Sequence, residues 1–273
     1  MGAKAKLVAE TAAMPALTEE IGPAAQEKSA AHASAEGPPE PARQTLSIII
    51  PIYNERQYVE KILERVQSAP IPPNLNREII VVDDGSTDGT TMMLETLGGD
   101  RTIKIHRSIL NFGKGTAIRV GLHYATGEYI LIQDADLEYD PNDYEQLLLP
   151  LLDGRADVVY GSRFIGKVKG MRWQNYLANR MLSLLSNVLY GAHITDEATG
   201  YKVFRRKVLD GMALKCKRFE FCPEITARVR KAGFQIYEVP ISYEARTAKD
   251  GKKIKLRDAW EAFYTLVKYR VVR

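Results

Sequence analysis

Two aspartates one residue apart, Asp134 and Asp136, follow the apolar run 129–132. A run this rich in isoleucine and leucine predicts a buried strand, so both carboxylates leave the core together and can face the same small volume. Two buried carboxylates without a partner repel each other, and the pKa of one of them rises sharply. A hard divalent cation such as Mg²⁺ or Mn²⁺ resolves this conflict, because it binds oxygen ligands and completes its shell with further oxygens, commonly those of phosphates. The spacing therefore suggests a metal that holds a diphosphate, although Asp-x-Asp is also common in plain surface loops.

Apolar and amphipathic segments alternate around this pair. Short runs of isoleucine and valine predict strands at 46–51, 79–82, 102–105 and 129–133. Apolar residues at helical spacing predict helices between them, at about 59–66, 92–97 and 114–125. This alternation predicts an α/β fold with a mostly parallel sheet and helices on both faces. Ligands bind such sheets beyond the carboxyl ends of the strands, where we expect three polar clusters to converge: 53–55, 83–84 and 134–136.

The pattern changes after residue 160. Further elements are predicted there, namely a helix at 172–189, a polar loop at 195–200, a helix at 223–232, a strand at 235–241 and a basic amphipathic helix at about 256–269. Residues 1–44 are rich in alanine, glutamate, proline and glycine, and they contain too few large apolar residues to offset chain entropy. We therefore expect a disordered tail over 1–44, a folded domain over 45–257 and a C-terminal amphipathic helix over 258–273.

Charge is distributed unevenly along the 273 residues. Segment 45–160 holds 10 basic and 18 acidic residues, whereas segment 161–273 holds 24 basic and 10 acidic residues. An acidic half followed by a basic half suggests a metal site that faces a surface attracting phosphates or anionic lipid. Ordinary solvated charges on helix faces explain part of this excess.

Several classes of protein are disfavoured by the sequence. It contains no run of about 18 apolar residues, so no transmembrane helix is expected, and its N-terminus does not resemble a secretory signal. The two cysteines, Cys216 and Cys222, cannot build a disulfide framework and lack a metal-ligand spacing. We expect a cytoplasmic protein with no nucleic-acid partner.

Six motifs occur in one order along the chain: PIYNE (51–55), VVDDGSTDGT (81–90), NFGKGTAIRVG (111–121), DADLEYDP (134–141), GSRF (161–164) and TGYKVFRR (199–206). Together they resemble family 2 glycosyltransferases, and in particular the dolichyl-phosphate mannose synthase-like branch, which includes polyprenyl-phosphate glucosyltransferases. The resemblance covers roughly 45–257. It implies the GT-A fold, a Rossmann-like sheet that binds a nucleotide-sugar, with an acceptor-side segment after the Asp-x-Asp motif.

The resemblance also implies a donor site. Glu55 and Asp84 match the nucleoside contacts of the family, and their carboxylates can accept hydrogen bonds from base N–H groups and ribose hydroxyls. Asp83 either shares this role or caps a turn. The full set expected at the nucleotide-sugar is Pro51, Tyr53, Glu55, Asp83, Asp84, Lys114, Asp134, Ala135 and Asp136.

Lys114 lies between two glycines, which would let the backbone approach a ligand closely. A positive charge at a helix start opposes the helix dipole, which favours a binding role over a structural one. The surrounding residues lack the P-loop spacing, so an ATPase is not indicated.

The metal, Mn²⁺ or Mg²⁺, is expected on Asp134 and Asp136, with Glu138 as a third ligand or a supporting group. Such a cation bridges the two phosphates of the donor and acts as a Lewis acid on the departing nucleoside diphosphate.

The acceptor decides the remaining chemistry. A hydroxyl acceptor needs a carboxylate base, for which Asp196 is the first candidate and Glu224 the second. A lipid phosphate is already anionic near neutral pH and needs cations instead. Arg163, Arg180 and Arg246 match phosphate-binding positions of the branch, and the expected acceptor-side cations are Arg163, Arg180, Lys202, Arg246 and Lys253. The residues expected in catalysis itself are Asp136, Arg163 and Asp196.

The last helix has two interpretations. Its basic charge with Trp260, Phe263 and Tyr264 suits a helix lying in a membrane interface. The same residues can instead pack on the core, which is the commoner fate of an amphipathic helix and the interpretation we favour here.

The sequence thus predicts an inverting, metal-dependent glycosyltransferase that moves a hexose from a nucleoside-diphosphate sugar, GDP-mannose or UDP-glucose, to a polyprenyl or dolichyl phosphate. Its alternatives are a transferase with a hydroxyl acceptor, a nucleotidyltransferase and a non-catalytic nucleotide-sugar binding module. If the acceptor is a lipid, we expect the protein to meet it by peripheral docking on the membrane.

Overall fold

The computed structural model describes residues 43–97, 102–246 and 256–272. The seven strands of these residues are β1 (Gln44–Ile52), β2 (Leu75–Asp83), β3 (Ile103–Arg107), β4 (Tyr129–Ile132), β5 (Val158–Lys169), β6 (Lys202–Arg205) and β7 (Tyr237–Glu244). The helices are α1 (Val59–Ser68), α2 (Thr90–Leu97), α3 (Lys114–Tyr124), the short 3₁₀ turn η1 (Pro141–Asp143), α4 (Tyr144–Leu152), α5 (Trp173–Tyr190), α6 (Arg206–Leu209), α7 (Phe221–Lys231) and α8 (Leu256–Val271). The described residues form one compact unit.

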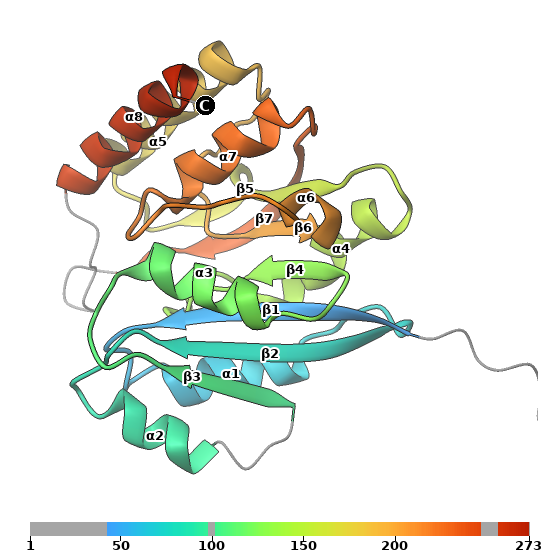
Figure 1. The fold of residues 1–273 in the computed structure, drawn as a ribbon, viewed down its shortest axis with the longest axis vertical. Coiled ribbons are helices and arrows are strands. Elements are labelled where there is room, and N and C mark those ends of the chain that lie inside the picture. Colours follow the sequence, from blue (N-terminus) through green and yellow to red (C-terminus); the bar gives the residue numbers. More distant parts are fainter. Residues whose placement is uncertain (1–42, 98–101, 247–255, 273) are drawn as a thin grey trace, which may run out of the picture. The chain divides into compact units, whose positions relative to one another are not determined.

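The strands form a single sheet in the order β3-β2-β1-β4-β6-β5-β7 (Figure 1). Strands β3, β2, β1 and β4 pair in parallel, as do β5 and β7, whereas β6 runs antiparallel between β4 and β5. The predicted mostly parallel sheet is therefore confirmed. Strands β5 and β6 were not predicted, because β6 is only four residues long and the second half of β5 is polar and exposed.

Helices cover both faces of this sheet, as expected from the alternation of elements. On one face, α1 and α4 pack on side chains such as Ile48 and Ile50 of β1. On the other face, α3 and α7 pack on Ile49 and on Ile80 of β2. Neighbouring residues of one strand thus enter two separate apolar layers, which fixes the register of β1 between them.

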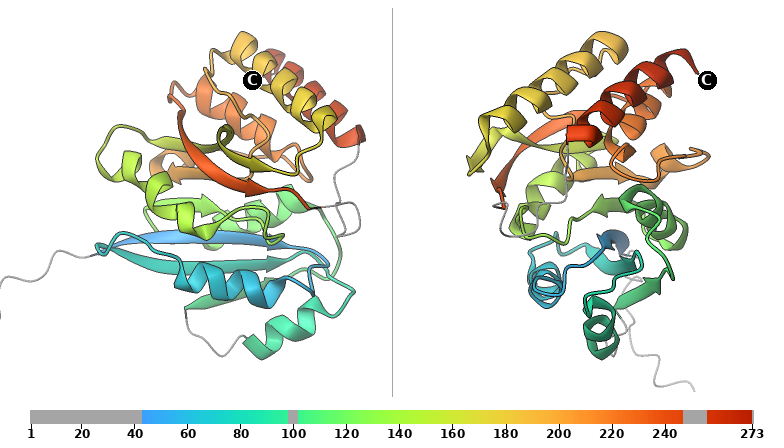
Figure 2. Two further views of the ribbon diagram at one scale, coloured as in Figure 1. Left: turned by 180° about the vertical axis from the view of Figure 1, so that it is seen from behind. Right: turned by 90° about the vertical axis from the view of Figure 1, so that its left-hand side faces the viewer.

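The last helix, α8, packs against α5 and α7 at one end of this arrangement (Figures 1 and 2). Its inner side contributes Ala262 and Leu266 to a small cluster with Leu182 of α5. Trp260, however, is 68 % exposed, and Phe263 and Tyr264 are exposed as well. The interpretation that these three aromatic residues pack on the core is therefore wrong. None of the described helices is both long enough and apolar enough to cross a bilayer.

Two predictions lie largely outside the described residues. The expected disordered tail, 1–44, overlaps the structure only at its last two residues, where Gln44 begins β1. The expected acceptor-side cation Lys253 falls in the segment 247–255, which the structure does not describe.

Glu78 connects several elements at the amino end of the sheet. Its carboxylate accepts hydrogen bonds from Lys104 Nζ at 2.5 Å, from the backbone N–H and hydroxyl of Thr126 at 2.9 and 2.8 Å, and from the hydroxyl of Ser47. Burial raises the pKa of Glu78, but these hydrogen bonds outweigh it and lower the pKa to about 2. One ionised side chain therefore joins β1, β2, β3 and the turn before β4.

This carboxylate predicts an acid-sensitive contribution to stability. A carboxylate whose pKa is lower in the folded protein than in the unfolded chain stabilises the fold. This stabilisation is complete above the unfolded-state pKa of 4.5, and it is lost as the pH falls through the folded-state pKa of about 2. We expect Glu78→Gln to reduce the free energy of unfolding by up to roughly 3 kcal/mol at neutral pH, with the difference from native protein shrinking below pH 4.5. Urea unfolding across this pH range measures it, with the exposed Glu60→Gln as control. A difference that does not change with pH would contradict this role.

Candidate functional site

A cavity of about 690 Å³ opens at the carboxyl ends of β1, β2 and β4. The predicted site residues that line it come from five separate motifs and are Pro51, Tyr53, Glu55, Asp84, Lys114, Asp134, Ala135, Asp136, Glu138 and Arg163. The expected convergence of polar clusters at the strand ends is thus present. The lining residues share no single stretch of chain, because the parallel sheet brings them together.

The two neighbouring aspartates after β2 have different environments. Asp84 lines the cavity, and its carboxylate accepts hydrogen bonds from the backbone N–H groups of Phe112 at 2.9 Å and Gly113 at 2.7 Å. Burial raises its pKa, and the two N–H groups oppose that rise. Asp83 is fully buried away from the cavity lining, where it accepts from Ser86 N and the Thr91 hydroxyl at 3.0 and 2.6 Å. This placement supports the turn-capping alternative for Asp83.

Lys114 begins α3 and forms an ion pair with Asp134, with 2.5 Å between Nζ and Oδ1. Burial opposes the charge of Lys114, but the nearby carboxylate of Asp134 raises its pKa, so the side chain stays protonated. The lysine charge therefore faces the carboxylate pair, which fits the predicted binding role.

The glycines on either side of Lys114 also have a packing function. A Cβ atom on Gly113 would lie 2.5 Å from the carbonyl oxygen of Lys217, and one on Gly115 would lie 2.9 Å from that of Arg218. Gly113 also has a φ of 98°, which side chains rarely adopt. The glycines thus allow the segment 216–218 to cross the start of α3, and Gly113 itself lines the cavity.

The carboxylates after β4 crowd one another. Burial, followed by the charges of Asp134 and Glu138, raises the pKa of Asp136 to about 7. Arg246 partly relieves this repulsion, because its guanidinium lies 3.3 Å from Asp136 Oδ2 and 3.0 Å from Glu55 Oε2. Cations from two distant parts of the chain thus balance the acidic end of the sheet.

Local backbone geometry holds the pair in place. Leu137, directly after Asp136, has a φ of 60°, a left-handed conformation that branched side chains rarely adopt and that tends to occur at functional sites. Gly200 packs against Asp134 so closely that a Cβ atom there would meet its carboxylate at 2.4 Å. Its backbone N–H also donates to the hydroxyl of Tyr139 at 2.8 Å.

A divalent cation fits Asp134 and Asp136 better than it fits all three predicted ligands. Both carboxyl oxygens of Glu138 accept short hydrogen bonds, from the Tyr243 hydroxyl at 2.7 Å and from Arg246 N at 2.8 Å, whereas those of Asp136 accept longer ones, from Glu138 N at 3.2 Å and Arg246 Nη2 at 3.3 Å. The described residues hold no cluster of three or more His, Cys, Asp or Glu side chains arranged for a metal ion. A cation on the aspartate pair would therefore depend on further oxygens from a ligand such as a diphosphate, and its charge would offset the repulsion that raises the pKa of Asp136.

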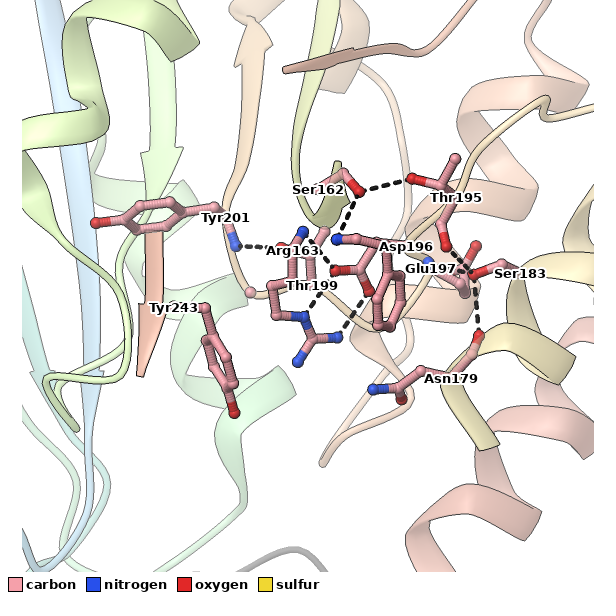
Figure 3. Close-up of polar contacts among 12 residues, drawn as sticks. Ser162, Arg163, Asn179, Ser183, Thr195, Asp196, Glu197, Thr199, Tyr201 and Tyr243 are labelled. Carbon is pink, nitrogen blue, oxygen red and sulfur yellow. Dashed lines mark hydrogen bonds and ion pairs between the residues drawn. The ribbon is translucent and has the colours of Figure 1, made fainter. Parts of the chain in front are cut away.

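Arg163 and Asp196 form a buried pair between β5 and the loop before β6 (Figure 3). The guanidinium donates to both carboxyl oxygens at 2.7 Å, and Arg163 N donates to Oδ2 at 3.0 Å. Arg163 lines the cavity, whereas Asp196 is fully buried outside the lining. Asp196 is therefore not placed as a general base, because both its oxygens already bind Arg163; it positions the arginine instead.

The other described acceptor-side cations that were predicted, Arg180, Lys202 and Arg246, lie outside the cavity lining. Lys202 is fully buried, with its ammonium over the Tyr160 ring and 3.0 Å from the Glu197 carbonyl, so it cannot meet a phosphate there. Arg180 is exposed on α5 and donates to the carbonyl of Thr195 at 3.2 Å. The spare base Glu224 is buried and accepts from Lys215 N, Cys216 N and Arg228, which excludes the role considered for it.

The half of the cavity that lies away from the strand ends has a different lining from the charged half, and it was not predicted. It extends beneath α5 and α8, where apolar and polar residues line it together: Met171, Ala178, Leu182, Ala259, Ala262, Phe219 and Phe221, and Gln174, Asn175, Asn179, Arg218 and Asp258. The sequence predicted both helices but not that they line one cavity. The cavity therefore joins a charged compartment at the strand ends to a more apolar compartment between two helices.

Comparison with known families gives a match to Glycosyl transferase family 2 over residues 47–212. Among curated proteins, the chain is 34 % identical over 217 residues to polyprenol monophosphomannose synthase of Mycolicibacterium smegmatis, covering 76 % of this chain and 79 % of that protein. It is 30 % identical over 234 residues to dolichol-phosphate mannosyltransferase of Pyrococcus furiosus, covering 82 % of this chain but only 64 % of the longer relative.

Solved structures confirm the fold. Glucosyl-3-phosphoglycerate synthase from Mycobacterium tuberculosis, crystallised with Mn²⁺, UDP and phosphoglyceric acid, superposes with a TM-score of 0.65 at 19 % identity, covering 84 % of this chain and 80 % of that one. The same enzyme crystallised with Mg²⁺ and UDP gives a TM-score of 0.64. At this identity the likeness establishes the GT-A fold.

The buried pair predicts a specific cost for its removal. Asp196→Ala leaves the Arg163 guanidinium buried without its carboxylate, which destabilises a protein by about 3–5 kcal/mol. We expect a corresponding loss in the free energy of unfolding, measured by urea denaturation, with the exposed Asp153→Ala as control. Arg163→Met combined with Asp196→Leu should recover much of the stability, since no charge is left buried. A stability equal to the native protein in Asp196→Ala would contradict the positioning role.

Proposed function

The chain belongs to glycosyl transferase family 2, and from this membership and its cavity we propose that it moves a hexose from a nucleoside-diphosphate sugar to a polyprenyl phosphate at a membrane surface. It is a glycosyltransferase with the GT-A fold. The observation that carries the proposal is the division of the cavity into a charged half at the strand ends and a more apolar half beneath α5 and α8. A donor diphosphate matches the first half, and the first isoprene units of a lipid match the second.

The charged half suits the donor. Glu55 and Asp84 offer carboxylates to the nucleoside, and Pro51 and Tyr53 offer flat apolar surface beside them. Mn²⁺ or Mg²⁺ on Asp134 and Asp136 would supply Lewis acidity toward the diphosphate. Lys114 adds a fixed positive charge 2.5 Å from Asp134, where the departing nucleoside diphosphate gains negative charge.

The acceptor half needs cations rather than a base. A phosphate monoester oxygen is anionic near neutral pH, so it can attack the sugar carbon directly, on the face opposite the leaving diphosphate, which inverts that carbon. Arg163 lines the cavity and is oriented by Asp196, so it presents a preorganised positive charge. Arg246 does not line the cavity but pairs with Glu55 and Asp136 of the charged half. We assign acceptor-phosphate binding to Arg163, with Arg246 adding positive charge to the same site.

The outer faces of α5 and α8 support the proposal of peripheral membrane docking. Trp173 is 70 % exposed and Trp260 is 68 % exposed, and both helices carry further exposed apolar side chains, namely Tyr176, Leu177, Met181, Leu184, Val188, Phe263, Tyr264 and Val267. Segment 163–190 contains five basic residues and no acidic one. Aromatic and aliphatic side chains beside such a charge excess suit an anionic bilayer surface, and the apolar compartment lies directly beneath the same helices.

A hydroxyl acceptor remains the second candidate, for one structural reason. Asp258, in the first turn of α8, lines the acceptor side of the cavity, 4.0 Å from Arg218 Nη2, and in this alternative it takes the general-base role first considered for Asp196. Activity on a soluble glycan that disappears in Asp258→Asn, with lipid phosphate inactive, would favour this candidate. Release of pyrophosphate in place of a nucleoside diphosphate would favour a nucleotidyltransferase.

The donor site predicts the behaviour of one substitution. Asp136→Asn keeps the shape of the side chain but removes the charge that a divalent cation needs, so we expect transfer to fall by about a hundredfold or more. The far-ultraviolet circular dichroism spectrum should not change, because the amide reduces the repulsion with Asp134 and Glu138. Release of nucleoside diphosphate measures the rate, with Asp153→Asn as a surface control. Near-native activity of Asp136→Asn in added Mn²⁺ would exclude the metal role.

A further inference from the structure

Tyr139 has a hydroxyl hydrogen for which the described residues provide no acceptor. The residue lines the cavity, although it is only 3 % exposed. Its hydroxyl oxygen accepts the backbone N–H of Gly200 at 2.8 Å, but within 43–97, 102–246 and 256–272 no group is placed to accept its hydrogen. A tyrosine hydroxyl donates as well as accepts, and the ordinary phenol pKa of about 10 keeps this hydrogen in place at neutral pH. Polar hydrogens in so enclosed a position normally have a partner, so we expect one that comes from a bound ligand.

The ring of Tyr139 is held in place by its neighbours. It stacks on the ring of Tyr201, with 4.7 Å between the centroids, and lies tilted against the ring of Tyr243 at 5.3 Å. An isolated backbone bridge also joins Tyr139 to Tyr243. Gly200 packs so closely that a Cβ atom there would lie 3.1 Å from Tyr139 Cε2. A side chain fixed in this way loses little conformational entropy when it binds a ligand, so the hydroxyl is preorganised as a donor.

Tyr139 lies between the donor and acceptor groups of the cavity. On the donor side, Gly200 packs against both Tyr139 and the carboxylate of Asp134. On the acceptor side, the guanidinium of Arg163 lies 5.1 Å from the centroid of the Tyr243 ring (Figure 3), and that ring packs against Tyr139. Burial raises the pKa of Tyr139, the charge of Arg163 opposes the rise and the charge of Asp134 adds to it, so both charges act on the hydroxyl. In the proposed function, this is where the acceptor phosphate meets the hexose of the donor.

The hydrogen-bonding groups near Tyr139 favour a phosphate over a sugar hydroxyl as its ligand. Asp196 binds Nε and Nη2 of Arg163, and no group of the described chain accepts from Nη1. Arg163 and Tyr139 therefore both offer hydrogens to a ligand. A phosphate monoester has several oxygens and can accept from both residues at once, and hydrogen bonds to an anionic oxygen are about twice as strong as those between neutral groups. A sugar hydroxyl has a single oxygen, and it also brings a hydrogen that needs an acceptor of its own.

We propose that the hydroxyl of Tyr139 donates to the phosphate of the lipid acceptor, beside Arg163, and so determines which phosphate oxygen faces the hexose. This inference rests on the proposed function, and it adds a neutral donor to the cations already assigned. With Tyr139 and Arg163 on two different oxygens, the phosphate is bound in one orientation and its third oxygen is left to attack. Because Tyr139 contacts the acceptor and not the nucleoside, its hydroxyl contributes to the affinity for the lipid phosphate and not to the affinity for the nucleotide.

The test compares Tyr139→Phe, which removes the hydroxyl and keeps the ring, with a matched control, Tyr201→Phe. Tyr201 is fully buried in the same ring cluster, does not line the cavity and donates to Gln133 at 2.7 Å, so each variant loses one buried hydrogen bond. Farnesyl phosphate is titrated into the full chain by calorimetry. We expect it to bind Tyr139→Phe about ten- to a hundredfold more weakly than it binds native protein and Tyr201→Phe, which is the usual effect of losing one hydrogen bond to a charged group. Farnesol, which lacks the phosphate, should bind all three proteins alike, and so should UDP and GDP, each with Mn²⁺.

Equal affinities of native protein and Tyr139→Phe for farnesyl phosphate would overturn the proposal. An equal loss in Tyr201→Phe would overturn it too, because the effect would then come from the packing of the rings. The same holds for weaker binding of farnesol, or of the nucleotide, to Tyr139→Phe, since the hydroxyl would then act on the lipid chain or on the donor site. The proposed function fails in a different way: native protein that binds UDP or GDP with Mn²⁺ but no farnesyl phosphate would refute the lipid acceptor itself. Native binding of farnesyl phosphate that Tyr139→Phe does not change supports that acceptor and refutes only the role of Tyr139.

Discussion

The mutual repulsion of Asp134, Asp136 and Glu138 is the constraint around which the site is built. Burial would make three neighbouring carboxylates costly, and the rise in the pKa of Asp136 to about 7 expresses that cost. The chain supplies two cations from distant segments, Lys114 at the start of α3 and Arg246 after β7. These cations reduce the repulsion without removing it, which leaves the site ready for a divalent ion that arrives with the oxygens of a diphosphate.

The donor half of this site was predictable because it depends on strand ends. Uninterrupted apolar runs identified β1, β2 and β4, and in a parallel sheet the residues that follow such strands converge. Asp84, Lys114 and Asp134 therefore lie together as expected. The different roles of Asp83 and Asp84 were not visible, because the two residues have the same side chain. Only the fold buries Asp83 against Ser86 and Thr91.

The acceptor half was harder to predict, because sequence shows charge but not burial. Lys202 and Arg163 are both basic residues near short motifs, yet one lies over the ring of Tyr160 beneath the cavity and the other lines it. The partner of Arg163, Asp196, is 33 residues away in sequence, and nothing in the spacing shows that the two face each other. The aromatic residues of α8 illustrate the same limit: helical periodicity places them on a stripe but does not say what covers it.

Helices α5 and α8 contact the cavity on one side and the solvent on the other. Their inner faces line the apolar compartment, while their outer faces expose tryptophan, leucine and methionine side chains beside a basic stretch. Helices that expose this many large apolar side chains are unusual at a protein–water boundary, where the outer side is normally polar. In the proposed function, the lipid acceptor explains the inner face and the bilayer explains the outer one.

The central claim is that sugar passes from a nucleotide donor to a lipid phosphate. Purified protein with Mn²⁺, a short-chain polyprenyl phosphate and a panel of labelled UDP- and GDP-sugars tests it, with label counted after extraction into organic solvent. Label from one donor, dependent on both metal and lipid phosphate, is the predicted result, and it also identifies the sugar. Donor binding or hydrolysis with no label in the organic phase would contradict the claim and assign the acceptor role to a soluble hydroxyl.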